Sequence, residues 1–99
     1  MEHRAYIIKV NGSIINLDHQ PTLSEAQTIV GGWIESIPSV YKFQKNQIIY
    51  VDEEGLIAGK PLNQKASDLL IPPQVIVGDA LILEGYKTVR TDKTKKELN

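Results

Sequence analysis

The fold is decided by the stretch Arg4-Ala5-Tyr6-Ile7-Ile8-Lys9-Val10-Asn11-Gly12-Ser13-Ile14-Ile15-Asn16-Leu17, which predicts two strands joined by a tight turn. Asn-Gly accepts positive φ at both positions, which favours a type I′ turn with the twist that adjacent strands need. Alternation along the first strand places Tyr6, Ile8 and Val10 on one face and Ile7 on the other. The chain is therefore expected to begin with a β-hairpin.

Helix signals follow the hairpin. Thr22 and Glu25 have the spacing of a capping box, in which the threonine caps a backbone N–H and the glutamate reaches back. Helical spacing then defines an apolar stripe of Leu23, Ala26, Val30 and Trp33. The helix is expected to end near Gly31-Gly32, because glycine readily adopts the left-handed conformation found at helix ends. Residues 33–37 are expected to be extended, since two adjacent glycines weaken a continuing helix.

The second half of the chain contains further strand signals. Runs rich in β-branched and apolar residues predict strands at Gln47–Val51, Leu56–Ala58, Val75–Val77 and Ala80–Leu83. A short helix is expected over Gln64–Leu70, before the helix-stopping Pro72-Pro73. The expected class is α+β: a small, mostly antiparallel sheet of about five or six short strands, with the N-terminal hairpin and one or two helices packed on one face.

Length and composition point to one domain. Ninety-nine residues leave no room for a second core. Hydrophobicity falls after residue 87, so a globular domain is expected over 1–87 and a flexible basic tail over 88–99, with Lys93, Lys95 and Lys96.

Charge and cysteine content narrow the class of function. The net charge of −1 lacks the basic excess expected for binding duplex nucleic acid. The absence of cysteine removes disulfides, thiolate nucleophiles and zinc fingers. No apolar run approaches the ~20 residues that span a bilayer, and the N-terminus lacks a signal-peptide pattern. A cytoplasmic protein without a membrane partner is the expectation.

No motif for catalysis or metal binding is present. The two histidines, His3 and His19, lack metal-site spacing, and no serine lies in a Gly-x-Ser-x-Gly elbow. The run Asp52-Glu53-Glu54 is typical of a solvated turn. A metal-dependent hydrolase would need Asp52 and Glu53 to converge with Asp79. The expectation is a protein that is not an enzyme and holds no metal or cofactor.

Four segments in order resemble a known family: Ile29–Glu35, Val51–Gly55, Gly59–Asn63 and Ile76–Asp79. The family consists of small phage and bacterial proteins classed as a domain of unknown function, and the resemblance covers roughly Leu23 to Leu83. It implies a setting in phages, prophages or mobile elements and a role in the contest between phage and host. Small phage proteins of this size often act by stoichiometric binding. Those that sequester nucleotide immune signals, called sponges, are compact, oligomeric and non-hydrolytic.

Five residues are candidates for ligand binding: Trp33, Tyr50, Lys60, Asn63 and Asp79. An aromatic ring would stack on a base, a lysine would pair a phosphate, and an asparagine would recognise a base edge or ribose. Trp33 has a second interpretation, which we favour from sequence alone, as the anchor of the small core, because tryptophan buries a large area.

Two kinds of non-enzymatic binder remain open. The leading hypothesis is a homo-oligomer that sequesters a cyclic or modified nucleotide in an anti-defence role. The alternative is a protein-interaction module that blocks a host defence or regulatory protein, through an uncovered strand such as Gln47–Val51 or through an exposed Trp33.

Overall fold

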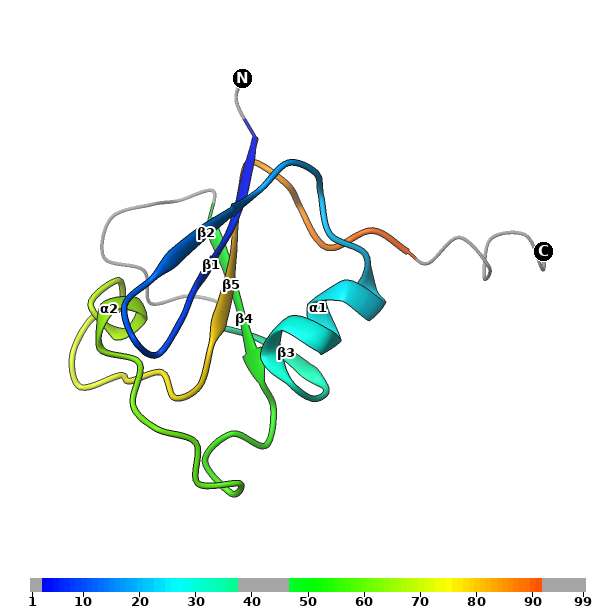
Figure 1. Cartoon of the computed structure of the whole chain (residues 1–99). Helices are drawn as coiled ribbons and strands as arrows, with labels where there is room; N and C mark the ends of the chain where they lie inside the picture. The colour runs from blue at the N-terminus through cyan, green and yellow to red at the C-terminus, as the bar shows by residue number, and fades with distance from the viewer. Residues whose placement is uncertain (1–2, 38–46, 92–99) are drawn as a thin grey trace.

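The N-terminal hairpin forms as predicted in the computed structural model, which describes residues 3–37 and 47–91 (Figure 1). Strands β1 (Arg4–Ile8) and β2 (Ile14–Leu17) pair antiparallel, with Ile7 opposite Ile15. Side chains alternate between the two faces of the sheet, as expected for strands.

The turn of this hairpin differs from the type I′ prediction. Within it only Gly12 has a positive φ, 93°. Lys9 N–H donates to Ser13 O and Gly12 N–H donates to Lys9 O, which is a three-residue loop with a glycine bulge. The type I′ prediction is wrong because its register would turn Leu17 to the opposite face. The observed register instead packs Leu17 against the core beneath the first helix.

The first helix follows its sequence signals closely. Helix α1 (Leu23–Val30) begins with the predicted capping box, in which Thr22 Oγ1 accepts from Glu25 N–H and Glu25 Oε1 accepts from Thr22 N–H. It ends at Gly31, whose φ is 85°. The next segment forms strand β3 (Ile34–Ile37), as expected.

The later elements are confirmed in part. Strands β4 (Gln47–Asp52) and β5 (Ala80–Glu84) form where predicted. Helix α2 (Gln64–Ser67) is shorter than predicted, because turn-like bonds from Leu69 N–H to Ala66 O and from Leu70 N–H to Ser67 O tighten its end.

Two predicted strands are absent from the described chain. Residues 56–58 lie in a run of turns, in which Ala58 N–H donates to Glu54 O and Lys60 N–H donates to Gly55 O. The strand prediction there is wrong because backbone N–H and C=O groups of these residues bond to one another within the turns rather than to a neighbouring strand. Residues 75–77 make a single isolated bridge, between Val77 and Leu62. The Ile76 N–H donates to the Ser67 hydroxyl, so it does not pair with a neighbouring strand.

The strands form a five-stranded antiparallel sheet in the order β2-β1-β5-β4-β3. The α+β class and the antiparallel sheet are therefore as predicted. Strands β2 and β3 are the edges. Strand β4 pairs with both β3 and β5, so the prediction that Gln47–Val51 is an uncovered strand is wrong.

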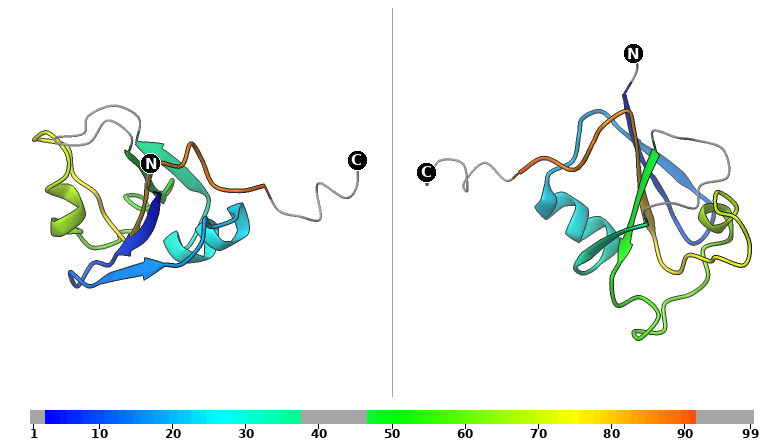
Figure 2. Two further views of the ribbon diagram at one scale, coloured as in Figure 1. Left: turned by 90° about the horizontal axis from the view of Figure 1, so that it is seen from above. Right: turned by 180° about the vertical axis from the view of Figure 1, so that it is seen from behind.

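The helices lie on opposite faces of the sheet rather than together on one face (Figures 1 and 2). On one face Ala26 of α1 packs in a cluster with Ala5, Tyr50, Leu81 and Leu83. On the other face α2 and the segment after it contribute to a second cluster: Tyr6, Ile8, Ile49, Ala66, Leu70, Ile76, Ala80 and Ile82. Burial on both faces explains why the central strand β5 is almost continuously apolar.

Two of the residues predicted to begin the flexible tail, Thr88 and Arg90, are bonded to the domain. Arg90 N–H donates to Pro21 O, and Leu23 N–H donates to Arg90 O. Thr88 binds the Tyr50 hydroxyl at 3.2 Å through its own side-chain oxygen. Thr88 is thus tied to β4 and Arg90 to the start of α1, and the remainder of the predicted tail (88–99), residues 92–99, lies outside the described residues. Neither helix in the described ranges reaches the length and hydrophobicity that crossing a bilayer requires.

Candidate functional site

The four segments that carry the resemblance meet around one ion pair. Lys60 Nζ lies 2.7 Å from Asp52 Oδ2 and also donates to Val30 O, at 2.7 Å, at the end of α1. The Asp52 side chain is 8% exposed and that of Lys60 25% exposed. The Lys60 ammonium, and after it the N–H of Glu54, hold the pKa of the Asp52 carboxyl below its ordinary value.

Three glycines leave the space that this ion pair fills. A Cβ on Gly31 would lie 2.9 Å from Lys60 Nζ, and one on Gly78 would lie 2.9 Å from Lys60 Cδ. A Cβ on Gly32 would lie 2.7 Å from Asp52 Oδ1. These glycines are therefore required by the close approach of side chains that come from other segments.

Backbone hydrogen bonds connect the same segments. Glu53 N–H donates to Trp33 O, and Gly78 N–H donates to Pro61 O, both at 2.8 Å. We call Gly31, Gly32, Asp52, Lys60 and Gly78 the glycine–ion-pair junction. Its lysine is held by two oxygens of the protein, so the junction joins segments and presents little free charge.

Asn63 also serves the fold. It is fully buried, its side-chain oxygen caps α2 by accepting from Ala66 N–H, and its amide donates to Ile8 O and Gly78 O at 2.8 Å each. Both amide N–H groups and the side-chain oxygen are therefore bonded within the protein. The side chain therefore has no group directed to solvent.

Tyr50 and Asp79 are placed away from each other. Tyr50 is 8% exposed and lies on the α1 face of the sheet. Asp79 accepts from Val10 N–H at 2.9 Å and pairs with Lys9 at 3.5 Å, beside the hairpin turn. Neither residue joins Lys60 in a common pocket.

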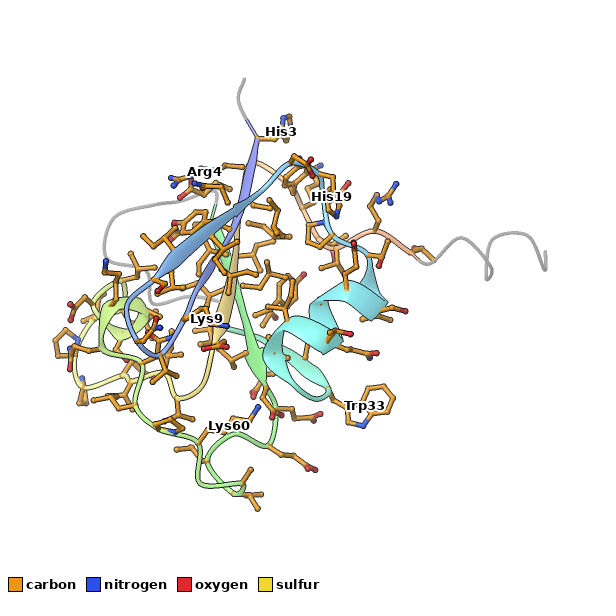
Figure 3. All side chains as sticks on the ribbon, viewed as in Figure 1. His3, Arg4, Lys9, His19, Trp33 and Lys60 are labelled. Carbon is orange, nitrogen blue, oxygen red and sulfur yellow. The ribbon has the colours of Figure 1, made fainter. Side chains whose placement is uncertain are left out.

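Trp33 is the most accessible of the five predicted site residues, with 68% of its surface exposed (Figure 3). The expectation that it anchors the core is wrong. The helix ends at Gly31, so the apolar stripe of α1 stops before it reaches Trp33. Leu56 and Ile57, in the turns after β4, are also exposed, at 77% and 88%.

Acidic side chains accompany this exposed tryptophan. The Glu53-to-Trp33 backbone bond continues the β3–β4 ladder by one pair, which places Trp33 opposite Glu53. Glu35 and Glu54 are exposed nearby in the chain, and none of the three glutamates forms an ion pair with a residue in the described ranges. We call Trp33, Glu35, Glu53, Glu54, Leu56 and Ile57 the Trp33 surface.

Among the described residues, one concave site lies beside α1, and another borders the Trp33 surface through Glu35, Glu53 and Leu56. One, of about 310 Å³, lies between the end of β2 and α1 and is lined by Leu17, His19, Pro21, Ser24, Glu25, Thr28 and Ile29. The other, of about 290 Å³, lies between β3, β4 and the segment 74–77, and its lining includes Glu35, Glu53, Val51 and Val75. None of the five predicted ligand-binding residues lines either cavity.

His19 was not predicted as a site residue, yet it lies at the rim of the first cavity. Its Nδ1 lies 2.8 Å from Asp18 Oδ1 and its Nε2 lies 3.0 Å from Glu25 Oε2. Hydrogen bonds to Asp18 and then Glu25 raise the pKa of His19 above its ordinary value. In the sequence, His19 lies six residues before Glu25, the glutamate of the capping box. This short separation is the signal that could have predicted their contact.

A partly buried polar network lies at the end of the sheet where β1 and β4 begin and β5 ends. Tyr6 Oη and Gln47 Nε2 both donate to Glu84 Oε2, at 2.9 and 3.0 Å, and Arg4 lies over the Tyr6 ring at 4.1 Å. Burial, followed by the hydrogen bond to Glu84, raises the pKa of Tyr6 to about 12. These groups satisfy one another's hydrogen bonds, and none of them lines either of the two cavities.

The carboxylates considered for hydrolysis do not converge in the described chain. Asp52 is bound to Lys60, and Asp79 is bound to Val10 and Lys9. Within residues 3–37 and 47–91, no three acidic or histidine side chains are grouped so as to hold a metal ion.

Comparison with known proteins agrees with the family that the four segments suggested. The family model described as Domain of unknown function (DUF3846) matches residues 2–98. No curated protein and no solved structure gives a significant match. Because the family model covers nearly the whole chain, the protein belongs to the DUF3846 family.

Proposed function

We propose that this protein is a non-enzymatic binding module that recognises a protein partner through the Trp33 surface. The observation that supports this most strongly is the 68% exposure of Trp33, which lies opposite Glu53 at the start of the turns that carry the still more exposed Leu56 and Ile57. Tryptophan is among the residues that contribute most to binding energy at protein interfaces. Leaving these side chains in water is unfavourable, and a partner that covers them recovers the free energy of their burial.

The charge of the surface indicates the chemistry of the partner. Glu35, Glu53 and Glu54 are exposed, Glu53 lies opposite Trp33, and none of the three has a cationic partner in the described parts of the chain. A partner with an apolar socket bordered by lysine or arginine would be complementary in both shape and charge. The same glutamates would repel a phosphate placed over Trp33.

A nucleotide ligand is the second candidate, because an exposed indole is also a platform on which a base can stack. In this version the protein sequesters a cyclic or modified nucleotide, without cleaving it, in the cytoplasm of a phage-infected host. Its support is the resemblance to phage proteins. Two contacts that were predicted for the nucleotide are not available, because Lys60 is bound to Asp52 and Asn63 is buried.

Capture from a bacterial host lysate tests the protein-partner proposal. Wild type should retain one protein stoichiometrically, Trp33→Ala should lose it, and Trp33→Phe should retain part of the binding. Ile71→Ser is a matched control, because Ile71 is 51% exposed but lies outside the Trp33 surface. Retention of the same partner by Trp33→Ala would show that the recognition surface is elsewhere.

Trp33 is the only tryptophan, so its fluorescence separates the two candidates. Titration with the captured protein should shift the emission to shorter wavelength as the indole leaves water. Titration with an adenine-containing cyclic dinucleotide should leave it unchanged if the partner is a protein. Quenching by the dinucleotide, with a raised melting temperature and the ligand recovered intact, would favour sequestration instead.

A further inference from the structure

Strand β2 is an edge strand with an open side in the described chain. Within residues 3–37 and 47–91 it pairs only with β1, and its four residues, Ile14–Leu17, carry no charge. Ile14 and Ile15 are each 44% exposed although they point to opposite faces of the sheet. Natural edge strands usually carry charges, prolines or bulges that prevent further pairing, and β2 has none of these within its span.

The register of the hairpin shows which backbone groups of β2 are unpaired. Lys9 N–H donates to Ser13 O, so Ser13, Ile15 and Leu17 direct their backbone groups toward β1. The groups of Ile14 and Asn16 therefore point outward, away from the sheet. These two residues offer two N–H donors and two C=O acceptors at the open edge.

We propose that β2 pairs antiparallel with β2 of a second copy of this chain, forming a continuous ten-stranded sheet across a two-fold axis. Ile14 then lies opposite the partner's Asn16, and Asn16 opposite the partner's Ile14. This register pairs every outward backbone group of both strands. It also places Ile15 opposite the partner's Ile15 at a narrow pair, where Cα atoms are about 4.5 Å apart.

Side chains at the interface support this register. The two Ile15 side chains meet on the α1 face, next to Leu17, which lines the 310 Å³ cavity. Asp18 is already paired with His19 at 2.8 Å and Lys9 with Asp79 at 3.5 Å, so the support for this register comes from the apolar contact of the two Ile15 side chains and from the paired backbone groups.

The mass in solution tests the dimer. At about 100 μM, which populates complexes of micromolar Kd, wild type should have twice the monomer mass of 11.1 kDa. Ile15→Asp places like charges across the axis and should weaken association by at least about tenfold. Ile57→Asp is the matched control, because Ile57 is exposed in a different part of the molecule, and it should remain dimeric. A monomeric wild type, or an unchanged Ile15→Asp dimer, would overturn the proposal.

Cysteine cross-linking tests the register even if Ile15→Asp is destabilised. The chain has no cysteine of its own, so any disulfide reports the introduced residue. Ile15→Cys should oxidise to a covalent dimer, because the two positions face each other across the axis. Ile14→Cys, with the same 44% exposure, should not, since it faces the partner's Asn16. Cross-linking of Ile14→Cys in preference to Ile15→Cys, or of both equally, would refute this pairing.

Discussion

Lys60 joins the end of β4 to the end of α1, because its ammonium binds the Asp52 carboxylate at 2.7 Å and the Val30 carbonyl at 2.7 Å. Four segments of the chain, Ile29–Glu35, Val51–Gly55, Gly59–Asn63 and Ile76–Asp79, meet around this contact. The contact is therefore a structural junction, and the surface that we propose for binding begins next to it, at Trp33.

Lys60→Met should destabilise the protein by about 2 kcal/mol, because it leaves the mostly buried Asp52 carboxylate and the Val30 carbonyl without their donor. The pKa of Asp52 is lowered in the folded state, so the contribution is present above its ordinary value of 3.8 and is lost as pH falls through the folded value. Urea unfolding at neutral pH and below about pH 3 would measure both effects. Lys65→Met, on the exposed side of α2, should cost less than about 0.5 kcal/mol.

Gly32→Ala should destabilise the protein by about 1–3 kcal/mol, because its Cβ would lie 2.7 Å from Asp52 Oδ1. The expected destabilisation is steric, so the loss of unfolding free energy caused by Gly32→Ala should be smaller in an Asp52→Ala background. A double-mutant cycle of the two changes, followed by thermal unfolding, measures the coupling. Additive effects would show that the strain has another origin.

Asn63→Ala should cost about 3 kcal/mol, because it removes the cap of α2 and leaves the carbonyls of Ile8 and Gly78 without a donor. Asn16→Ala, at an exposed position, serves as the control and should cost less than about 0.5 kcal/mol. If the two variants unfolded at the same denaturant concentration, the role assigned to Asn63 would be wrong.

His19→Gln should remove a pH-dependent part of the stability. The pKa of His19 is raised on folding by Asp18 and Glu25, so the stabilisation is fully present below its ordinary value of 6.5 and is lost as pH rises through the folded value. The melting temperatures of wild type and variant should therefore differ more at about pH 6 than at about pH 8.5. In an Asp18→Asn/Glu25→Gln background, where glutamine retains the capping box, the difference should disappear.

Trp33→Ala should change the free energy of unfolding by less than about 0.5 kcal/mol, because the side chain is 68% exposed. Leu81→Ala, at a fully buried position of β5, should cost about 2–5 kcal/mol. The emission maximum of wild type should lie close to that of tryptophan in water. A large loss of stability in Trp33→Ala would restore the idea of a core anchor.

Sequence alone determined the elements whose signals lie within a few residues of one another. Thr22 and Glu25 complete the capping box within one helical turn, and Gly31 ends the same helix. The β-branched run at 47–51 and the paired runs around Asn11-Gly12 likewise specify strands locally. These features were predictable because neighbouring residues supply all the atoms that each one requires.

Tertiary structure decided which side chains are available to bind anything. In the sequence, Lys60 and Asn63 are polar residues that could bind a ligand. In the fold, Lys60 binds Asp52, and Asn63 donates to Ile8 and Gly78, so their polar groups are used within the protein. Trp33 is exposed because α1 ends at Val30, before the helical stripe reaches it. The local sequence pattern does not predict which of these side chains are exposed. Burial and hydrogen bonding depend on contacts between segments that are distant in the sequence, and those contacts form only in the folded protein.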